Sequence, residues 1–352
     1  MKALVYHGHE DVRLSEIPKP QVKTEDEVLI KVEYAGICGS DLARIIGSMG
    51  RKLDTPVPHG HEFSGIVEEI GASVHDLKPG DRVAVAPKVV CGACENCTNN
   101  KVGQCSAEKR FIGVTLPGGW ASYCVLPRVN LVKLPDSVSA VQGAFFEPLT
   151  VAIHSAMISK FQTGSSAAVM GCGSIGLLMV QTLHYFGASN LSAFDINEEK
   201  LSLAKKYGSA YEVNTSGNWI DQANEITGGR LYDFVFEAGG VEFTEKASIL
   251  LAGAQATVAY VGTPFSDIHF TAREFEEINR RELWLKGIWQ SYSTPFPGEE
   301  WTIAGKMFSE GKVQIDELID RVIKPEELHV TLEDIKNKKV TGKVLIDFSK
   351  EV

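Results

Sequence analysis

The sequence predicts an α/β protein with two domains, a β-rich domain like a barrel and a doubly wound parallel sheet. Two observations predict this division. Over roughly the first 150 residues, short β-branched segments are separated by turn signals, which is typical of a β-barrel. From about residue 166 onward, apolar strands alternate with segments of helical periodicity, which indicates βαβ units and a parallel sheet. The length of 352 residues is sufficient for two domains.

Three β-branched segments in the first domain are predicted to be strands: 28–32, 63–67 and 81–85. Glycine and proline turns, such as Pro79-Gly80-Asp81, bound these segments. The first six residues alternate like a further strand and do not have the form of a signal peptide.

One βαβ unit in the second domain is especially clear. Its predicted elements are a strand at 167–170, a turn at 171–176, a helix at 177–186, a strand at 191–194 and a helix at 198–207. After about residue 290, a loop rich in proline and aromatic residues interrupts the alternation, and two helices and a last strand at 343–346 follow. We expect this tail to return to the first domain. The expected domain boundaries are 1–154, 155–292 and 293–352.

Four cysteines in the frame C-x2-C-x2-C-x7-C form the most informative motif of the chain. Thiolates this close in sequence can converge on one tetrahedral Zn²⁺ ion, and three of them within seven residues cannot span a domain as disulfides. A shell of four sulfurs has no open position for a substrate, so this site predicts a structural role. The predicted ligands are Cys91, Cys94, Cys97 and Cys105, in a lobe at about 88–110.

A second, looser constellation predicts a catalytic metal site. Cys38 lies in Gly-Ile-Cys-Gly-Ser-Asp, His61 in Gly-His-Glu, and Glu147 in Phe-Phe-Glu-Pro. A thiolate, an imidazole and a carboxylate supply three protein ligands to zinc and leave the fourth position for water or an alcohol oxygen. Each residue alone has an ordinary structural reading, such as a buried thiol or a satisfied polar histidine.

A G-x-G-x-x-G motif at 171–176 lies between a predicted strand and a predicted helix, and an acidic residue ends the next strand. This is the context that dinucleotide binding requires, with the pyrophosphate at the helix N-terminus. The acidic residue can accept hydrogen bonds from the ribose hydroxyls and would repel a 2′-phosphate, so NAD is favoured over NADP. The predicted cofactor-binding residues are Gly171, Gly173, Ser174, Ile175, Gly176 and Asp195.

An open metal site beside a dinucleotide domain predicts alcohol oxidation. Zinc lowers the pKa of the alcohol, and the alkoxide then gives a hydride to the nicotinamide. Ser40 follows Cys38 closely and could relay the proton. Asp41 could accept the second ring hydrogen of His61 and so fix its tautomer. Both polar residues could equally be turn formers after Gly39.

These motifs resemble those of the zinc-containing medium-chain alcohol and polyol dehydrogenases. The resemblance covers essentially the whole chain and includes the Pro-Gly-Asp-Arg-Val turn at 79–83. It implies a GroES-like β-barrel catalytic domain, with a Rossmann domain inserted before its C-terminal part. It also implies that Cys38 and His61 are catalytic zinc ligands, that Ser40 is the proton relay, and that the four clustered cysteines bind the structural zinc.

The resemblance also draws attention to two carboxylates. Simple alcohol dehydrogenases carry a third cysteine where this chain has Glu147, which is the polyol-dehydrogenase pattern. Glu62 could also approach the metal, and the sequence leaves open which carboxylate binds. Such a shell is harder than one with two sulfurs, so Mn²⁺ or another divalent ion could replace zinc.

A narrower likeness joins the loop 289–301 with segments 39–42 and 145–148, which resemble those of sugar-alcohol-phosphate dehydrogenases. It implies that a secondary alcohol of a polyol phosphate, of the galactitol 1-phosphate type, is oxidised to the ketose phosphate. The loop could instead pack a domain junction or a subunit interface. A phosphate requires cations near the cleft, and the spacing selects none of the available arginines: Arg44, Arg110, Arg280 and Arg281.

Composition limits the possible partners. The net charge of −10 gives a nucleic acid no overall attraction, and no apolar run approaches the roughly 20 residues of a membrane span. Cysteines with metal spacing fit a reducing cytoplasm. The expected partners are a small polyol or polyol phosphate and further copies of the chain, in a homodimer or homotetramer.

Several alternative functions remain open at this point. On the same fold, the chain could be an unphosphorylated polyol dehydrogenase of the sorbitol type or an L-threonine dehydrogenase. A metal-free quinone reductase is disfavoured, because such enzymes lack the pair formed by Cys38 and His61. A zinc-ribbon binding module is a candidate from another class, but it leaves the dinucleotide motif unexplained.

Overall fold

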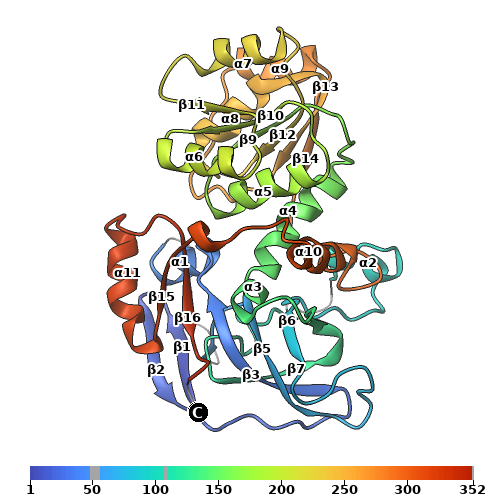
Figure 1. Ribbon diagram of the computed structural model, residues 1–352, viewed down its shortest axis with the longest axis vertical. Coiled ribbons are helices and arrows are strands. Elements are labelled where there is room, and N and C mark those ends of the chain that lie inside the picture. Colours follow the sequence, from blue (N-terminus) through green and yellow to red (C-terminus); the bar gives the residue numbers. More distant parts are fainter. Residues whose placement is uncertain (48–55, 107–109, 351–352) are drawn as a thin grey trace. The chain divides into compact units, whose positions relative to one another are not determined.

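The computed structural model describes residues 1–47, 56–106 and 110–350, and it divides into two compact units (Figure 1). The segments of unit 1 are Met1–Pro148, Tyr292–Gly311 and Ile315–Val352, and those of unit 2 are Leu149–Ser291 and Lys312–Gln314. Residues 107–109 of the predicted cysteine lobe lie outside the described residues. The first boundary between the units falls after Pro148, whereas the sequence analysis expected it after residue 154. One helix, α4 (Phe146–Ile158), therefore begins in unit 1 and continues in unit 2.

The strands of unit 1 are β1 (Lys2–Gly8), β2 (Asp11–Glu16), β3 (Glu27–Gly36), β4 (Val57–Pro58), β5 (Phe63–Ile70), β6 (Arg82–Val85), β7 (Tyr123–Pro127), β8 (Leu131–Lys133), β15 (Ile319–Ile323) and β16 (Lys343–Asp347). Its helices are α1 (Gly39–Ile45), α2 (Glu95–Thr98), α3 (Ala140–Gly143), α10 (Glu299–Ser309) and α11 (Leu328–Lys336). Short 3-10 turns lie at Val102–Gln104, Arg128–Asn130, Asp316–Leu318 and Pro325–Glu327.

Unit 1 is built on a sheet with the strand order β15-β16-β3-β5-β6-β8, in which β7 also pairs with β3. Its pairs are antiparallel, apart from the parallel pair of β15 and β16. A smaller antiparallel sheet has the order β2-β1-β4. Val28, Ile30 and Val32 alternate along β3, so their side chains lie on the same face of the strand. All three are buried in the hydrophobic core of unit 1.

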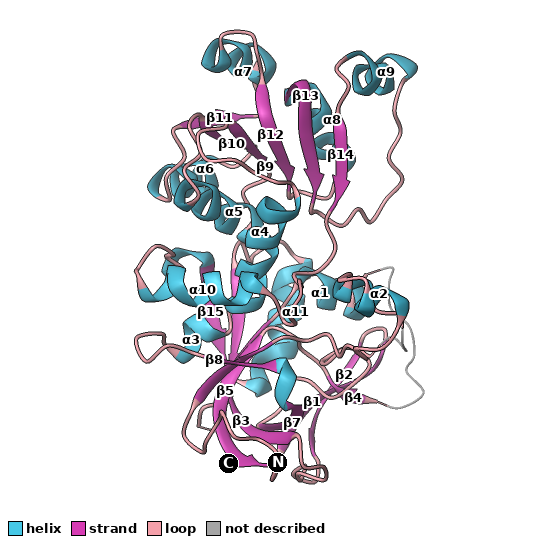
Figure 2. Ribbon diagram, turned by 90° about the vertical axis from the view of Figure 1, so that its right-hand side faces the viewer, coloured by secondary structure: helices cyan, strands magenta, loops and turns pink. Residues whose placement is uncertain are grey.

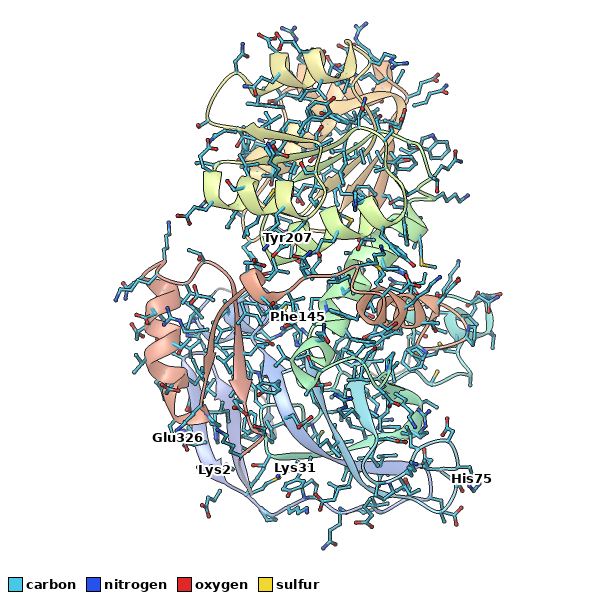
Figure 3. The ribbon with its side chains drawn as sticks, viewed as in Figure 1. Lys2, Lys31, His75, Phe145, Tyr207 and Glu326 are labelled. Atoms are coloured by element: carbon cyan, nitrogen blue, oxygen red, sulfur yellow. The ribbon has the colours of Figure 1, made fainter. Side chains whose placement is uncertain are left out.

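The C-terminal segment completes unit 1. Strand β16 lies antiparallel to β3, with Leu345 opposite Gly36 at the point where β3 leads into the Cys38 motif. At the other end of the unit, Lys2 of β1 forms a 2.8 Å ion pair with Glu326, and Figure 3 shows the two side chains together.

Unit 2 contains the strands β9 (Ala167–Met170), β10 (Leu191–Asp195), β11 (Tyr211–Asn214), β12 (Tyr232–Glu237), β13 (Ala252–Tyr260) and β14 (Trp284–Gly287). Besides most of α4, its helices are α5 (Ser174–Tyr185), α6 (Glu198–Lys206), α7 (Trp219–Thr227), α8 (Glu242–Leu251) and α9 (Ala272–Arg280).

The sheet of unit 2 is wholly parallel, with the order β11-β10-β9-β12-β13-β14, and Figure 2 shows β12, β13 and β14 side by side. Helices α5 and α6 contact one another, while α7, α8 and α9 form a second group, as expected of a doubly wound sheet. The predicted parallel α/β domain is therefore present. No helix in the described ranges is both long and apolar enough to cross a bilayer.

Candidate active site

The Cys38 motif lies where β3 passes into α1. Cys38 is the N-cap of this helix, and its backbone N–H donates to Asp41 Oδ2 at 3.0 Å. This bond closes the first turn of the helix. The hydroxyl of Ser40 donates to Cys38 Sγ at 3.4 Å, so the predicted relay residue touches the predicted ligand.

The second motif, at 60–62, lies between β4 and β5. Gly60 has a φ of +84°, and a Cβ atom there would lie 2.0 Å from the ring of Trp120, so the turn requires glycine. A Cβ atom on Gly36 would lie 2.4 Å from Glu62 Oε2, so a larger residue there would displace this carboxylate. The two glycines thus bring the backbone of both motifs close enough for their side chains to meet.

Cys38, His61 and Glu62 form a group that could hold a metal ion, here called the metal group, with ligand atoms that all lie within 4.8 Å of one another. His61 and Glu62 are buried, and Cys38 is half-buried. Of the two carboxylates between which the sequence left the choice open, Glu62 belongs to this group and Glu147 does not. The reason is local, since Glu62 follows His61 directly at the start of β5.

Glu147 nevertheless lies in the same electrostatic environment. It is on the first turn of α4, where burial raises the pKa of its carboxyl to about 7, with a lowering effect from His61 and a further rise from Glu62. The two carboxylates therefore repel one another, and a divalent cation would relieve that repulsion.

Asp41 lies on the other side of the histidine. Its Oδ1 atom is 3.3 Å from His61 Nδ1 and 3.1 Å from Nε2 of His59, and its side chain is fully buried. Burial alone would raise the pKa of Asp41, but His61 and His59 outweigh it and lower the pKa. Asp41 Oδ1 therefore lies within ion-pair distance of the ring nitrogen, although the two atoms do not form a hydrogen bond. The sequence analysis did not name His59, although its position two residues before His61 was a usable signal.

The charge of the site favours a cation. Burial disfavours the charged form of His61, but Asp41 and then Cys38 outweigh burial and raise its pKa well above the ordinary value. The ring of His61 therefore lies beside the acidic groups of Asp41 and Cys38. One sulfur, one nitrogen and one oxygen donor in a buried, negative setting fit Zn²⁺ as the bound ion.

The sequence analysis also missed a buried lysine that contacts Glu62. Lys343, the first residue of β16, is 7% exposed, and its Nζ donates to Glu62 Oε2 at 2.7 Å and Oε1 at 2.8 Å. It also donates to the carbonyl oxygen of Ile37 at 3.3 Å. Burial lowers the pKa of Lys343, but Glu62 and Cys38 more than offset this and raise it.

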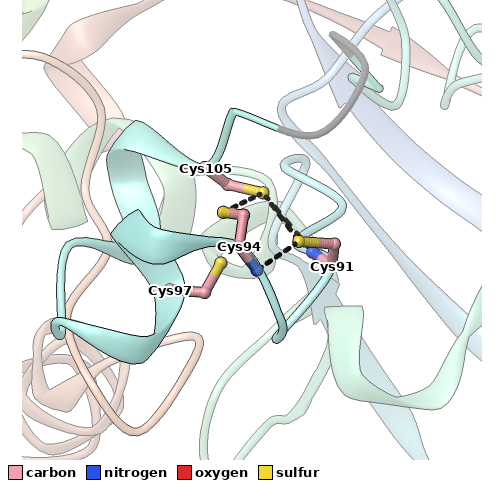
Figure 4. Close-up of side chains that lie close together, drawn as sticks. All are labelled: Cys91, Cys94, Cys97 and Cys105. Atoms are coloured by element: carbon pink, nitrogen blue, oxygen red, sulfur yellow. Dashed lines mark hydrogen bonds between the residues drawn. The ribbon is translucent and has the colours of Figure 1, made fainter.

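The four clustered cysteines converge in a separate group, with sulfur atoms within 4.8 Å of one another (Figure 4). Cys94 Sγ lies 3.8 Å from Cys105 Sγ, which lies 3.6 Å from Cys91 Sγ. A tetrahedron of thiolates at the usual Zn–S length of about 2.3 Å has S···S edges of about 3.8 Å, so the spacing fits zinc. All seven cysteines of the chain, each in a described range, are free thiols.

The surroundings of the four thiols differ. Backbone N–H groups of Cys97 and Ser106, with the Ser106 hydroxyl, lower the pKa of Cys94 to about 5. Burial, together with Cys94 and Cys105, raises the pKa of Cys97 to about 12. A metal ion would remove this contrast, because it binds all four as thiolates.

The dinucleotide motif lies at the carboxyl end of β9. Gly171 has a φ of +95°, and a Cβ atom on Gly176 would lie 1.8 Å from the Gly171 carbonyl oxygen, which is the close packing that the motif requires. Gly173 is the N-cap of α5 and has open space above it. Helix α5 starts at Ser174, not 177, so Ser174, Ile175 and Gly176 form its first turn.

Asp195 ends β10, as predicted, but its carboxylate also makes contacts within the chain. Oδ2 accepts the N–H of Cys172 at 2.6 Å, and Oδ1 accepts the N–H of Asn197 at 2.9 Å. Each carboxylate oxygen keeps a lone pair, so ribose hydroxyls can still donate to Asp195. The residues present fit a dinucleotide at this edge of the sheet.

Glu237, at the end of β12, is another residue that the sequence analysis did not identify. Its Oε1 atom accepts the N–H groups of Gly239 and Gly240 at 2.8 and 2.7 Å and the Thr244 hydroxyl at 2.6 Å. A Cβ atom on Gly171 would lie 2.9 Å from Gly239 N. Glu237 therefore fixes the backbone beside the dinucleotide turn.

Comparison with known proteins places this geometry in a family. Residues 24–136 match the model of the alcohol dehydrogenase GroES-like domain, and residues 174–305 match that of the zinc-binding dehydrogenases. The chain belongs to the zinc-binding dehydrogenase family. It is an enzyme of that family, with a GroES-like and a Rossmann-type domain, and zinc is its metal.

The relatives of this dehydrogenase act on polyols. Galactitol 1-phosphate 5-dehydrogenase of Escherichia coli is 36% identical over 98% of this chain and 99% of its own. Sorbitol dehydrogenase of Bacillus subtilis is 34% identical over 75% of each chain. The zinc-ribbon and quinone-reductase alternatives do not account for these matches. The dehydrogenase is therefore a member of the zinc-dependent polyol dehydrogenases.

Solved structures agree with this fold over nearly the whole chain. The crystal structure of galactitol-1-phosphate dehydrogenase from Escherichia coli has a TM-score of 0.92 and 36% identity, covering 99% of this chain and all of that one. A zinc-binding dehydrogenase from Sinorhizobium meliloti, bound to NADP, has a TM-score of 0.87 and 31% identity, covering 98% of each chain.

Proposed function

We propose that this dehydrogenase oxidises a secondary alcohol of a polyol phosphate, of the galactitol 1-phosphate type, to the ketose phosphate with NAD as the hydride acceptor. The observation that carries the proposal is the convergence of Cys38, His61 and Glu62, with Ser40 bonded to the sulfur, in a chain that also holds the dinucleotide turn. The phosphorylated substrate is supported by the full-length similarity to the Escherichia coli enzyme.

The chain's own residues supply positioning and proton transfer. A zinc ion held by Cys38, His61 and a carboxylate would act as a Lewis acid that lowers the pKa of the substrate alcohol. Ser40 Oγ, which lies beside Cys38, would take the alcohol proton and pass it outward. Asp41 would hold the ring of His61 in one tautomer, through the contact at Nδ1.

The choice of NAD rests on the end of β10. The carboxylate of Asp195 would repel a 2′-phosphate, and the residues that follow, Ile196 and Asn197, add no positive charge. One relative was solved with NADP bound. In this chain, Asp195 favours the cofactor that lacks the 2′-phosphate, which is NAD.

The phosphate contact is narrowed by the pairing of the candidate arginines. Arg280 bonds Glu276 at 2.9 Å, and Arg281 bonds Glu277 at 2.9 Å and also two backbone carbonyl oxygens. Arg44, whose Nη1 also donates to the Ser40 carbonyl oxygen at 2.8 Å, and Arg110 are the candidates that belong to the unit that contains Cys38, His61 and Glu62. We therefore propose that one of these two arginines binds the phosphate.

A paired substrate assay tests the function. With NAD, we expect kcat/KM for galactitol 1-phosphate to exceed that for galactitol by at least about a hundredfold, because charge-assisted hydrogen bonds to the phosphate are lost in galactitol. The preference should fall in Arg44→Gln or Arg110→Gln. Equal rates, or faster oxidation of sorbitol or L-threonine, would instead support one of the unphosphorylated alternatives.

The sorbitol-type alternative has its own support in the similarity to the Bacillus subtilis enzyme.

Two further proposals concern the state of the protein in the cell. The four clustered free thiols support a reducing cytoplasm. The exposed apolar side chains on edge strand β14 support a homodimer or homotetramer.

A further inference from the structure

Lys343 binds both oxygens of Glu62, and this contact has a consequence for the metal site. The two side chains are 281 residues apart in sequence and are both buried, with 7% and 2% exposure. An ammonium group has three N–H donors, and those of Lys343 have three acceptors in Glu62 Oε1, Glu62 Oε2 and the Ile37 carbonyl. The lysine is therefore satisfied entirely by residues next to the ligands His61 and Cys38.

The carboxylate of Glu62 is confined on its other side as well. A Cβ atom on Gly36 would lie 2.4 Å from Oε2, so the oxygen rests against the backbone of β3. The backbone N–H of Ile37 donates to the carbonyl of Val344 at 3.0 Å, which ties the strand that carries Lys343 to the Cys38 motif. Because the backbone is tied in this way, Glu62 can separate from Lys343 only if the side chain of Glu62 itself rotates.

The same carboxylate is one of three groups that can hold a metal ion. Two cations, the ammonium and the metal ion, therefore compete for its oxygens. Glu62 held by Lys343 is a weakened and displaceable ligand, because its charge is partly neutralised and its lone pairs are shared. Cys38, His61 and Glu62 would leave the fourth tetrahedral position to water or substrate, and a displaceable Glu62 would free a second position, whereas a firmly bound Glu62 would not.

We propose that Lys343 is a positioning residue that restrains Glu62 and so keeps the catalytic metal site open. The inference rests on the proposed function only in that Cys38, His61 and Glu62 hold a metal ion. This role and a simple supporting role predict opposite effects of a Lys343 substitution on metal affinity. Loss of a residue that merely orients a ligand weakens metal binding by about 10- to 100-fold. Loss of Lys343 should strengthen it, because the freed carboxylate can bind the metal fully.

The test measures metal affinity, so its result does not depend on the identity of the substrate. The catalytic site is emptied in wild type and in Lys343→Met, and Zn²⁺ affinity is measured by competition with a chromophoric chelator. We expect Lys343→Met to bind Zn²⁺ at least about tenfold more tightly, on the scale of other changes around metal ligands, and to have a lower kcat. An unchanged or weaker affinity would overturn the proposal.

Three further variants make the interpretation specific. Lys343→Arg keeps the charge and should restore the wild-type affinity. In Glu62→Gln, the added change Lys343→Met should have no effect on affinity, because the restrained carboxylate is gone. Lys133→Met removes a cation that pairs with Asp81 at 2.8 Å elsewhere in unit 1 and should bind Zn²⁺ as the wild type does.

The variant leaves Glu62 without its cation, so Lys343→Met could fail to fold without metal. In that case the protein is prepared with Zn²⁺, and the rate of metal transfer to the chelator is measured. Slower release than from wild type supports the restraint by Lys343, and faster release contradicts it. A dehydrogenase that rejects polyol phosphates but shows these shifts would disprove the proposed substrate and leave the role of Lys343 standing.

Discussion

Two buried ionic side chains, Asp41 and Lys343, contact different members of the metal group, His61 and Glu62. Asp41 faces His59 and His61 and accepts the backbone N–H of Cys38, while Lys343 binds Glu62. Asp41 is paired with two histidines and Lys343 with a carboxylate. If one residue of such a pair is removed, the charge of the other stays buried without a partner. At the scale of single residues, the site is therefore a set of matched charges, and the effect of a substitution depends on which charge it leaves unmatched.

Replacement of Cys38 by serine should abolish turnover while NAD still binds. The weaker oxygen ligand removes the thiolate of the metal group, and we expect kcat/KM to fall by at least about a thousandfold, or about 4 kcal/mol. NAD binding is followed by quenching of tryptophan fluorescence. Cys124→Ser, at a buried thiol of the same unit, is the control and should stay active. A fully active Cys38→Ser enzyme would exclude the thiolate as a ligand.

Replacement of Asp195 by alanine should weaken NAD and narrow its advantage over NADP. A hydrogen bond to a charged acceptor contributes about 1.5–3 kcal/mol, so the Kd for NAD should rise by about tenfold or more. Because the two oxygens of Asp195 also accept the N–H groups of Cys172 and Asn197, the melting temperatures of Asp195→Ala and wild type are compared as a control for the loop itself. An unchanged preference between the two cofactors would rule out a ribose contact.

Glu245 of α8 should make the stability of unit 2 depend on pH. It is 5% exposed, and burial, with a contribution from Glu237, raises the pKa of its carboxyl from 4.5 to about 7. The folded state then binds more protons than the unfolded state between these values. The contribution of Glu245 is therefore fully present below pH 4.5 and is lost as the pH rises through 7, by up to about 3 kcal/mol.

The comparison of Glu245→Gln with wild type isolates this contribution. Denaturant unfolding is measured at several pH values from 4.5 to 8. The variant should be relatively more stable at the upper end, since its amide stays neutral. Parallel pH profiles for the two proteins would show that Glu245 has an ordinary pKa.

Single elements carry the ligands, and most of them could be predicted from local sequence. The strands at 167–170 and 343–346 were found because short β-branched or apolar runs are bounded by turn residues. The start of α5 was misplaced by three residues, because Gly176 was taken for the turn although it lies inside the helix. Glycine at that position serves close packing, which the pattern of helix propensity does not reveal.

The lobe around α2 is an element that depends on its metal. In Cys97→Ser, one of four ligands becomes a poor one, and we expect loss of the structural zinc and a fall in metal content from two ions per chain to one. Because structural zinc contributes folding free energy, the lobe should become sensitive to proteolysis and the melting temperature should fall. Elemental analysis and limited proteolysis measure these effects. Two retained zinc ions would contradict the assignment.

At the scale of the whole molecule, contacts between distant parts of the sequence were the least predictable. The tail was expected to return to the first domain, but nothing local indicated that Lys343 would meet Glu62. The sequence likewise left open whether Glu62 or Glu147 binds the metal, since spacing along the chain does not tell which carboxylate lies near the thiol; in the structure it is Glu62 whose ligand atom lies within 4.8 Å of those of Cys38 and His61. The Cys-x-x-Cys frame and the glycine turn were predictable because their chemistry lies within a few neighbouring residues.

Assembly belongs to this scale as well. Strand β14 forms one edge of the six-stranded sheet, and its Trp284 is 70% exposed. If copies of the chain associate there, Trp284→Lys should lower the mass measured by analytical ultracentrifugation. The control Trp289→Lys changes another exposed tryptophan, outside the strand. A wild-type protein that sediments as a monomer would disprove the predicted homo-oligomer.

The pairing of β16 with β3 also has a consequence for biosynthesis. Residues from the two ends of the sequence meet in this sheet, with all of unit 2 encoded between them. During translation, unit 2 can fold as soon as it leaves the ribosome, whereas the sheet beneath the Cys38 motif must wait for the last strand. A nascent chain should therefore acquire its nucleotide-binding capacity before it can mature into a working catalyst.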